Sequence, residues 1–437
     1  MTSADQTSFA RPNSVPGTAV PVRPPSPLVI ALVGLVSLSL AMGLGRFSFT
    51  PLLPMMLHDG RVDLAQGSWL ATSNYLGYFA GAALCSVLPS LWRRLGGSEP
   101  PAERLALGGL AATAVLLGVM ALPWPAVWGT ARFLAGVASA VAFVFVSSWC
   151  LLRLAQRQAT ALAGLIYTGP GVGIAVSGLG VSAMVSWGWH SAAGWVVMAL
   201  LACAGLAWVV RVLQRDRDAN GPAAAHVPNT AGRPAEPPAA VVPPAGRGGS
   251  RTLVAWIVVG YGLAGFGYII TATFLPVMAR DALPGSAWID LFWPLFGLAV
   301  IAGCLIATRL PQHWDNRLSM AVCYGLQAVG VVMGLLWPTV AGFVLGSLLV
   351  GLPFTALTLF TLREVRQRWP QQAASLIALV TAAYAIGQIL GPPLVNALLA
   401  HTASRAQGFA WSLATACGAL LAGMVVWLVM YLSLIHI

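Results

Sequence analysis

The segment Gly43-Leu44-Gly45-Arg46, followed by Leu53-Pro54-Met55-Met56, occurs twice in this chain. It returns 222 positions later as Gly265-Phe266-Gly267-Tyr268 and Leu275-Pro276-Val277-Met278. Further matches at similar offsets pair Phe133 with Phe343, Gly136 with Gly346 and Gly173 with Gly387. Self-similarity at this spacing indicates a chain built from two copies of one structural unit in the same order.

The composition places both copies in a membrane. Of the 437 residues, 58% are hydrophobic and only 8% are charged, whereas a soluble domain carries about 25% charged residues. Twelve apolar runs are long enough to cross a bilayer as helices, and none shows the alternation of a membrane barrel. They lie near residues 28–57, 65–88, 105–122, 126–151, 159–185, 190–213, 252–279, 286–307, 318–338, 340–362, 373–399 and 408–432.

These runs divide the chain into four parts. We expect a disordered cytosolic tail over 1–27, a six-helix bundle over 28–213, a cytosolic linker rich in Pro and Ala over 214–251, and a second six-helix bundle over 252–437. The linker contains seven prolines and too little apolar surface to form a core. The fold class expected is an all-α membrane protein with twelve transmembrane helices in two parallel-repeat bundles, whose shared site lies at their interface.

The distribution of charge predicts the topology. All 23 basic residues are arginines. With the amino terminus inside, 18 of them fall on the cytoplasmic side and only Arg61, Arg280 and Arg405 on the other. This asymmetry predicts a multi-pass protein of a bacterial inner membrane with both termini cytoplasmic. It also makes nucleic acid a poor choice of partner, although the net charge is +11.

Two bundles of six helices with a central linker resemble the major facilitator superfamily of transporters. Two segments, Gly45 to Pro54 and Trp69 to Tyr78, are similar to the YbfB/YjiJ-like branch of that superfamily. Arg132 to Gly136 resembles the fourth-helix Arg-x-x-x-Gly element, and Gly169 to Gly173 resembles part of the fifth-helix pattern of antiporters. The loop after the second helix departs from the superfamily pattern, because Leu91 to Gly96 keeps two arginines but has no Asp.

Arg46 is the leading candidate for contact with a solute. A guanidinium at mid-membrane costs on the order of 2.5–3.5 kcal/mol, so it must find a cavity, a partner or the membrane surface. No acid lies deep in the first half, which leaves backbone carbonyls, a group from the second half or an anion as its partner. Two readings stay open: a gating or structural arginine, and a fork of donors that binds a carboxylate or phosphate.

Other polar and aromatic residues within the spans could line the same site. A mid-membrane amide is as often an interhelical contact as a ligand contact, and large aromatic side chains are usually packing. With Arg46, the predicted solute-binding residues are Asn74, Tyr75, Tyr78, Tyr268, Trp293, Phe354 and Gln388.

Coupling and gating have their own candidates. Asp290 is the one carboxylate expected inside a membrane span, so it is the candidate proton relay. It could also contact Arg46 or Arg132 across the two halves. Arg132 itself is assigned a structural or coupling role. Small residues and prolines allow close helix packing and kinks. The residues expected to act in this way are Gly169, Pro170, Gly173, Gly387, Gly391 and Pro392.

The absence of other motifs narrows the function. The chain has no P-loop, no HExxH and no clustered Cys or His, so we expect no enzyme activity, cofactor or metal. We predict a monomeric secondary-active transporter that moves a small polar or anionic organic solute by alternating access, with H⁺ as a candidate coupling ion and export favoured by the antiporter-like pattern. Two alternatives are a proton-linked drug or sugar efflux antiporter in which Arg46 is structural, and a transporter-like membrane sensor without flux.

Overall fold

The computed structural model describes residues 24–96, 102–220, 251–311 and 313–435. Within these ranges all regular structure is helical, and twelve helical spans are long and apolar enough to cross a membrane. The prediction of an all-α, twelve-span membrane protein is therefore confirmed. Most of the predicted tail and linker lies outside the described residues, but helices extend into both: the first starts at Pro27, the sixth span continues to Asn220 and the seventh starts at Arg251.

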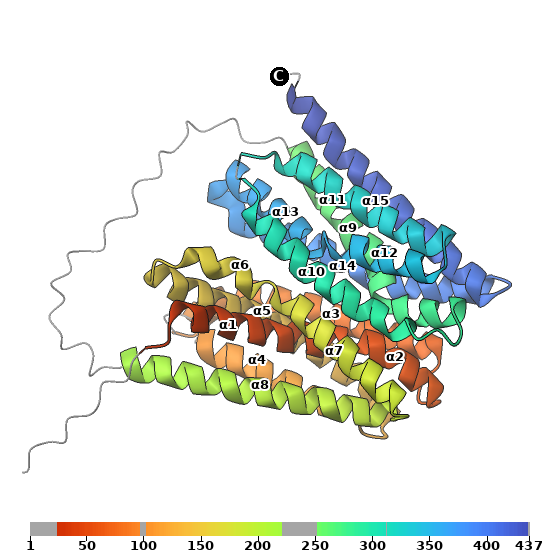
Figure 1. The fold of residues 1–437 in the computed structure, drawn as a ribbon. Helices are drawn as coiled ribbons and strands as arrows, with labels where there is room; N and C mark the ends of the chain where they lie inside the picture. Colours follow the sequence, from red (N-terminus) through yellow and green to blue (C-terminus); the bar gives the residue numbers. More distant parts are fainter. Residues whose placement is uncertain (1–23, 97–101, 221–250, 312, 436–437) are drawn as a thin grey trace, which may run out of the picture.

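The first six spans form one bundle, drawn in red to yellow-green in Figure 1. Their elements are α1 (Pro27–Leu38) with the π-helix η1 (Ser39–Phe47) and α2 (Phe49–His58), α3 (Leu64–Arg94), α4 (Ala102–Val119), α5 (Pro125–Gln156), η2 (Thr160–Leu162) with α6 (Ala163–Ile166) and α7 (Gly169–Ser186), and α8 (Ser191–Asn220).

The last six spans form the second bundle, drawn in green to blue. They consist of α9 (Arg251–Ala282), η4 (Ile289–Leu291) with α10 (Phe292–Arg309), α11 (Asn316–Leu336), α12 (Val340–Gly351) with α13 (Phe354–Arg368), η5 (Pro370–Gln372) with α14 (Ala373–His401), and α15 (Arg405–Ile435).

Matching glycines make the same helix crossing in each bundle. A Cβ added to Gly43 of η1 would lie 2.3 Å from the Cα of Gly173 on α7. In the second bundle, a Cβ on Gly387 of α14 would lie 2.2 Å from the carbonyl oxygen of Gly262 and 3.1 Å from the carbonyl carbon of Gly265, the repeat equivalent of Gly43, both on α9. Only glycine permits backbones to approach this closely. The sequence repeat is thus also a repeat of helix packing.

The two bundles are fastened in equivalent ways at the end that carries Asp59 and Asp281. Asp59, at the end of α2, accepts hydrogen bonds from the Ser191 backbone N–H at 2.6 Å and from His190 Nδ1 at 3.1 Å, and so holds the start of α8. Its repeat equivalent, Asp281, pairs with Arg405 at the start of α15. Burial would raise the pKa of Asp59, but the hydrogen bonds from Ser191 and His190 outweigh that effect and lower the pKa below its usual range.

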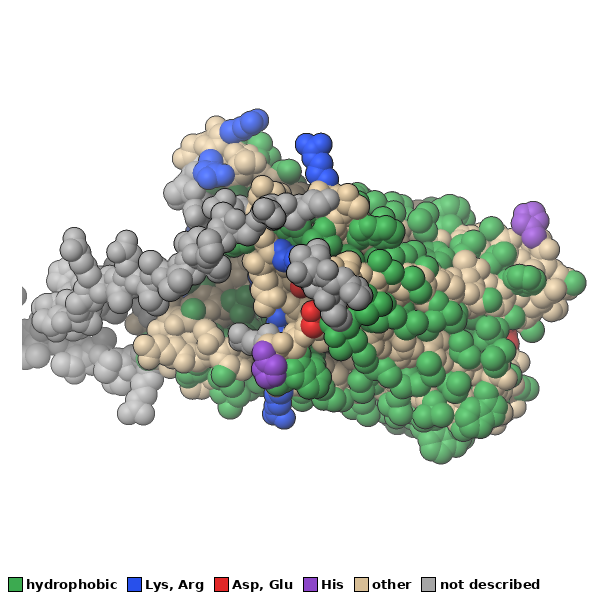
Figure 2. Space-filling view, turned by 90° about the horizontal axis from the view of Figure 1, so that it is seen from above, with side chains coloured by type: hydrophobic (Ala, Val, Ile, Leu, Met, Phe, Trp, Pro, Cys, Tyr) green, Lys and Arg blue, Asp and Glu red, His purple; other side chains and the backbone are tan. Residues whose placement is uncertain are grey.

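The surface between the helix ends is apolar. In the view of Figure 2 most side chains are hydrophobic, and the arginines gather at one end of the molecule. Exposed tryptophans lie near the helix ends on both sides, such as Trp69, Trp187 and Trp411 at the end opposite most arginines and Trp314 at the arginine-rich end. Such amphipathic rings are enriched where a membrane meets water, and the whole pattern is that of a multi-pass membrane protein.

The two bundles meet through α2 against α9, α3 against α14, and α7 against α10. Thr50 Oγ1 donates a hydrogen bond of 2.8 Å to the backbone oxygen of Ala272. These two residues are repeat equivalents, since they are 222 positions apart. Equivalent positions touch only at the axis that relates two copies, so the first and seventh spans meet on the axis of the repeat.

Candidate functional site

Arg46 lies in the π-helical segment η1, close to that axis. Nine residues, Ser39–Phe47, adopt the wider π turn between α1 and α2, and all nine are buried. Single π turns within α-helices occur frequently at functional sites. Arg46 itself is only 3% exposed, so its charge is held inside the protein.

Arg132 stabilises this unusual turn. It is 2% exposed, and its Nη1 and Nη2 donate to the backbone oxygens of Gly45 at 3.1 Å and Arg46 at 3.2 Å. In a π turn the oxygen of Arg46 would accept from the N–H of residue 51, but that residue is a proline and has no N–H. Arg132 Nη2 therefore gives the Arg46 oxygen a donor that Pro51 cannot provide.

The Arg46 guanidinium is surrounded by aromatic rings. Its Cζ lies 4.3 Å from the ring centroid of Tyr78, 4.9 Å from that of Tyr75 and 5.3 Å from that of Phe47. Each face of an aromatic ring attracts a cation, more strongly where water is excluded. These contacts offset part of the cost of burying the charge.

The hydrogen-bond partner of Arg46 comes from the other bundle. Arg46 Nη2 donates to Gln388 Oε1 of α14 at 2.5 Å. Gln388 Nε2 donates in turn to the hydroxyl of Tyr268 on α9. Arg46 and Tyr268 are repeat equivalents, and Gln388 bridges them. The structure thus places three of the predicted solute-binding residues in one buried chain across the two halves.

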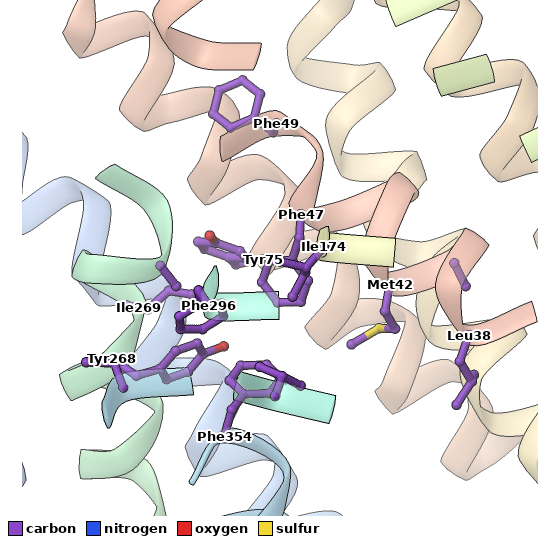
Figure 3. Packing of buried hydrophobic residues seen from close by; sticks show 14 of the residues in the cluster. Leu38, Met42, Phe47, Phe49, Tyr75, Ile174, Tyr268, Ile269, Phe296 and Phe354 are labelled. Atoms are coloured by element: carbon purple, nitrogen blue, oxygen red, sulfur yellow. The ribbon is translucent and has the colours of Figure 1, made fainter. Parts of the chain in front are cut away.

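Aromatic residues from both bundles extend this centre (Figure 3). Phe47 makes an edge contact with Phe354 at 5.8 Å, and Tyr268 makes one with the same ring at 5.1 Å. Trp293 stacks on Phe296 at 5.0 Å and lies 6.4 Å from Phe47.

Several buried polar atoms in this region have no hydrogen-bond partner. They include Arg46 Nε, Asn74 Oδ1, Arg132 Nε, Thr271 Oγ1 and Trp293 Nε1. Buried polar groups are normally paired, and donors or acceptors left free at a domain interface are suited to a ligand. Asn74 also fixes the helix packing, because its Nδ2 donates to the Arg132 oxygen at 2.9 Å. Tyr75 bonds to Thr273 of the other bundle at 2.8 Å.

Asp290 lies apart from this centre. The eighth span begins at Ile289 rather than at residue 286, so Asp290 is at its very end and 24% exposed. It pairs with Arg280 of the same bundle. In this structure the Asp290 carboxylate pairs with Arg280 rather than with Arg46 or Arg132, and it joins the end of α9 to η4; its role as a proton relay stays a prediction.

The predicted packing residues lie at helix crossings. A Cβ on Gly169 would meet the Leu35 oxygen at 2.4 Å, and one on Gly391 would meet Ile269 at the same distance. Pro170 is in the first turn of α7, where the missing N–H costs nothing, and Pro392 is inside α14. In the described part of the chain, no three His, Cys, Asp or Glu side chains gather as metal ligands would.

Sequence reasoning missed several members of the centre. Phe47 follows Arg46 directly, Phe296 is one helical turn from Trp293, and Tyr384 is one turn before Gln388 and stacks at 5.8 Å on Tyr268. Helical neighbours of a predicted site residue were the available signal. The π turn had no signal in the sequence that we can identify.

Two like bundles, twelve spans and a buried polar centre on the repeat axis define a transporter of the major facilitator type. Residues 38–429 match the family model described as "Uncharacterised MFS-type transporter YbfB", and the chain belongs to this family. It is a secondary transporter and not an enzyme, which confirms these two general predictions; the solute and the direction of transport stay predictions.

Solved structures support the same fold. Two crystal structures of the nucleoside transporter NupG, one of a mutant, superpose on this chain with a TM-score of 0.68 in both cases. Their sequences are 15% and 13% identical to this chain. The superpositions include 92% and 93% of this chain and 100% and 98% of the NupG chains. No curated protein matches the sequence.

Proposed function

We propose that this protein moves a small organic anion across a bacterial inner membrane by alternating access, with Arg46 as the group that binds the anion. The observation that carries the proposal is a buried guanidinium at the contact of the two bundles whose hydrogen-bond partner is a neutral amide, Gln388. Buried charges are normally paired with an opposite charge. An anionic solute would supply that charge when the bundles separate.

Alternating access needs contacts between the halves that can be broken. Arg46–Gln388, Tyr75–Thr273 and Thr50–Ala272 are such contacts, and each is a single hydrogen bond. We propose that solute binding exchanges the first of these for a contact with the solute. The proposed direction of transport is export. The distribution of arginines along the sequence supports a topology with both termini in the cytoplasm. We propose that the protein acts as a monomer.

A second function rests on the same contacts. Three aromatic faces and Gln388 already surround Arg46, which favours a structural arginine in a transporter of neutral solutes, such as a drug, a sugar or a nucleoside. NupG is a nucleoside transporter, although an identity of 15% carries no substrate assignment.

Counterflow in proteoliposomes tests the proposal. The purified protein should exchange a labelled organic anion against the same anion on the other side, and Arg46→Gln should abolish exchange of the anion while neutral solutes are unaffected. A neutral solute exchanged equally well by both proteins would establish the second function. Binding of an anion with no exchange under any gradient would indicate a sensor.

A further inference from the structure

We propose that the solute is an aromatic carboxylate, whose carboxylate takes the place of the Gln388 amide oxygen at Arg46 and whose ring enters the aromatic cluster. This inference rests on the proposed function and specifies its substrate class. Three features of the centre carry it: its charge, its free donors and its rings.

The charge of the centre selects an anion. Arg46 and Arg132 are 3% and 2% exposed, and the backbone of Arg46 bonds to the side chain of Arg132. The buried carboxylates in the described ranges are Asp216 and Glu364. Asp216 pairs with Arg153 and Arg157 at the end of α5. Glu364 pairs with Arg317 at the start of α11 and with Arg368 at the end of α13. Two uncompensated positive charges therefore repel a cation and attract an anion through a medium of low dielectric constant.

The free donors select a carboxylate. A guanidinium presents five N–H groups in a planar fork that matches two carboxylate oxygens. Gln388 occupies one end of the fork through Nη2, and Arg46 Nε has no acceptor although it is buried. Trp293 is 1% exposed, and its Nε1 is a second buried donor without an acceptor. The two side chains that carry these donors flank one ring, because the Phe47 centroid lies 5.3 Å from Arg46 Cζ and 6.4 Å from the Trp293 ring centroid.

The rings select an aromatic body. Five rings, those of Phe47, Tyr268, Trp293, Phe296 and Phe354, form a connected cluster across the two bundles, with three edge contacts, one stacked contact and one tilted contact. Aromatic pairs prefer these arrangements and gain affinity beyond the burial of apolar area. A planar ring that enters between Phe47 and Phe354 keeps ring contacts on both sides, whereas a saturated ring of similar size loses them.

The position of Gln388 links binding to movement of the halves. Gln388 is 2% exposed and belongs to the second bundle, while Arg46 belongs to the first. A carboxylate at Arg46 removes the only hydrogen bond that Arg46 side-chain atoms make to the other bundle in the described structure. Binding of the solute therefore releases a contact between the bundles.

A matched series of ligands tests the inference on the intact protein. Phenylacetate, cyclohexylacetate and phenylacetamide share their size and differ in ring or charge, and uridine adds an uncharged aromatic solute. Affinities are measured by the ligand-dependent shift of the melting temperature. We expect phenylacetate to bind about 10-fold more tightly than cyclohexylacetate and at least about 10-fold more tightly than phenylacetamide or uridine.

Each result has a defined meaning. Equal binding of cyclohexylacetate overturns the aromatic part and leaves anion transport intact. If phenylacetamide or uridine binds as tightly as phenylacetate, both the anionic part of the inference and the proposed function are overturned. If phenylacetate does not bind up to 10 mM (roughly the limit of specific recognition) while another anion is exchanged, only the inference is overturned. Phenylacetate that binds selectively but is not exchanged supports the site and overturns transport.

A variant pair locates the ring contact. Phe354→Leu should reduce the preference for phenylacetate over cyclohexylacetate to less than about 3-fold. Phe133→Leu is the matched control, since Phe133 is 36% exposed on α5 and does not belong to the cluster. A preference that both variants retain would overturn the placement of the ring, and the ligand series on the unmodified protein remains decisive if Phe354→Leu does not fold.

Discussion

Replacing Gln388 by glutamate puts a carboxylate where we place that of the solute. The side chains are nearly isosteric, so the new oxygen would lie close to the 2.5 Å that now separates Gln388 Oε1 from Arg46 Nη2. With charge centres about 4 Å apart and an effective dielectric constant of about 20, the attraction is about 4 kcal/mol. Desolvation of the second charge costs several kcal/mol, so the free energy of unfolding should change by less than about 2 kcal/mol.

The effect on solute binding is much larger, because an external anion must now displace an ionic partner instead of an amide. We expect a loss of about 2–4 kcal/mol in binding free energy, equivalent to about 30- to 700-fold in Kd. Gln388→Ala is the matched control. It removes a competing hydrogen bond of about 1 kcal/mol, so anions should bind up to about 5-fold more tightly.

Binding of radiolabelled phenylacetate to detergent-solubilised protein measures both changes, with the melting temperature of each variant as the check on folding. The two substitutions should shift Kd in opposite directions. If Gln388→Glu binds phenylacetate as well as the unmodified protein does, or if Gln388→Ala weakens binding to the same degree as Gln388→Glu, Gln388 and the solute do not compete for Arg46.

Three further predictions concern stability in detergent. Gly77→Ala should destabilise by about 1–3 kcal/mol, because the new Cβ would lie 1.8 Å from the Phe133 oxygen; Gly108→Ala, which meets nothing within 4 Å, should be neutral or stabilising by up to about 1 kcal/mol, and equal melting temperatures would contradict the packing argument. Arg132→Met should cost about 1–3 kcal/mol in chemical unfolding, since methionine has no donor for either backbone oxygen; an unchanged midpoint would show that the π turn does not need Arg132. Above about pH 4, Asp59→Asn should have a lower melting temperature than the unmodified protein, because the folded state stabilises the Asp59 carboxylate. This difference in melting temperature should disappear as the pH falls from 3.8, the usual pKa of Asp, through the lowered pKa of Asp59. A difference that persists at pH 2 (roughly two units below) would argue against the charge of Asp59 as the cause.

The number of spans and their grouping into two like halves were readable from the sequence. Membrane spans need about 20 apolar residues in continuous runs, and this requirement is local. The repeat could be aligned by offsets of 210 to 222 residues, and the glycines that it aligned make equivalent crossings, with Gly43 on Gly173 in one half and Gly265 near Gly387 in the other. Arg46 was also identifiable, because any arginine in an apolar run must be accounted for.

The partners of Arg46 depended on tertiary structure. Gln388 is 342 positions away and comes beside Arg46 only because the two bundles meet on the repeat axis. Asp290, which the predicted span boundaries placed inside the membrane, lies at a helix end and pairs with Arg280. An error of a few residues in a predicted boundary is enough to move a carboxylate from the membrane interior to its surface. Hydrophobicity along the chain determines which segments enter the membrane, whereas the direction of a polar side chain depends on helix rotation, on the π turn at Ser39–Phe47 and on close packing between segments far apart in sequence.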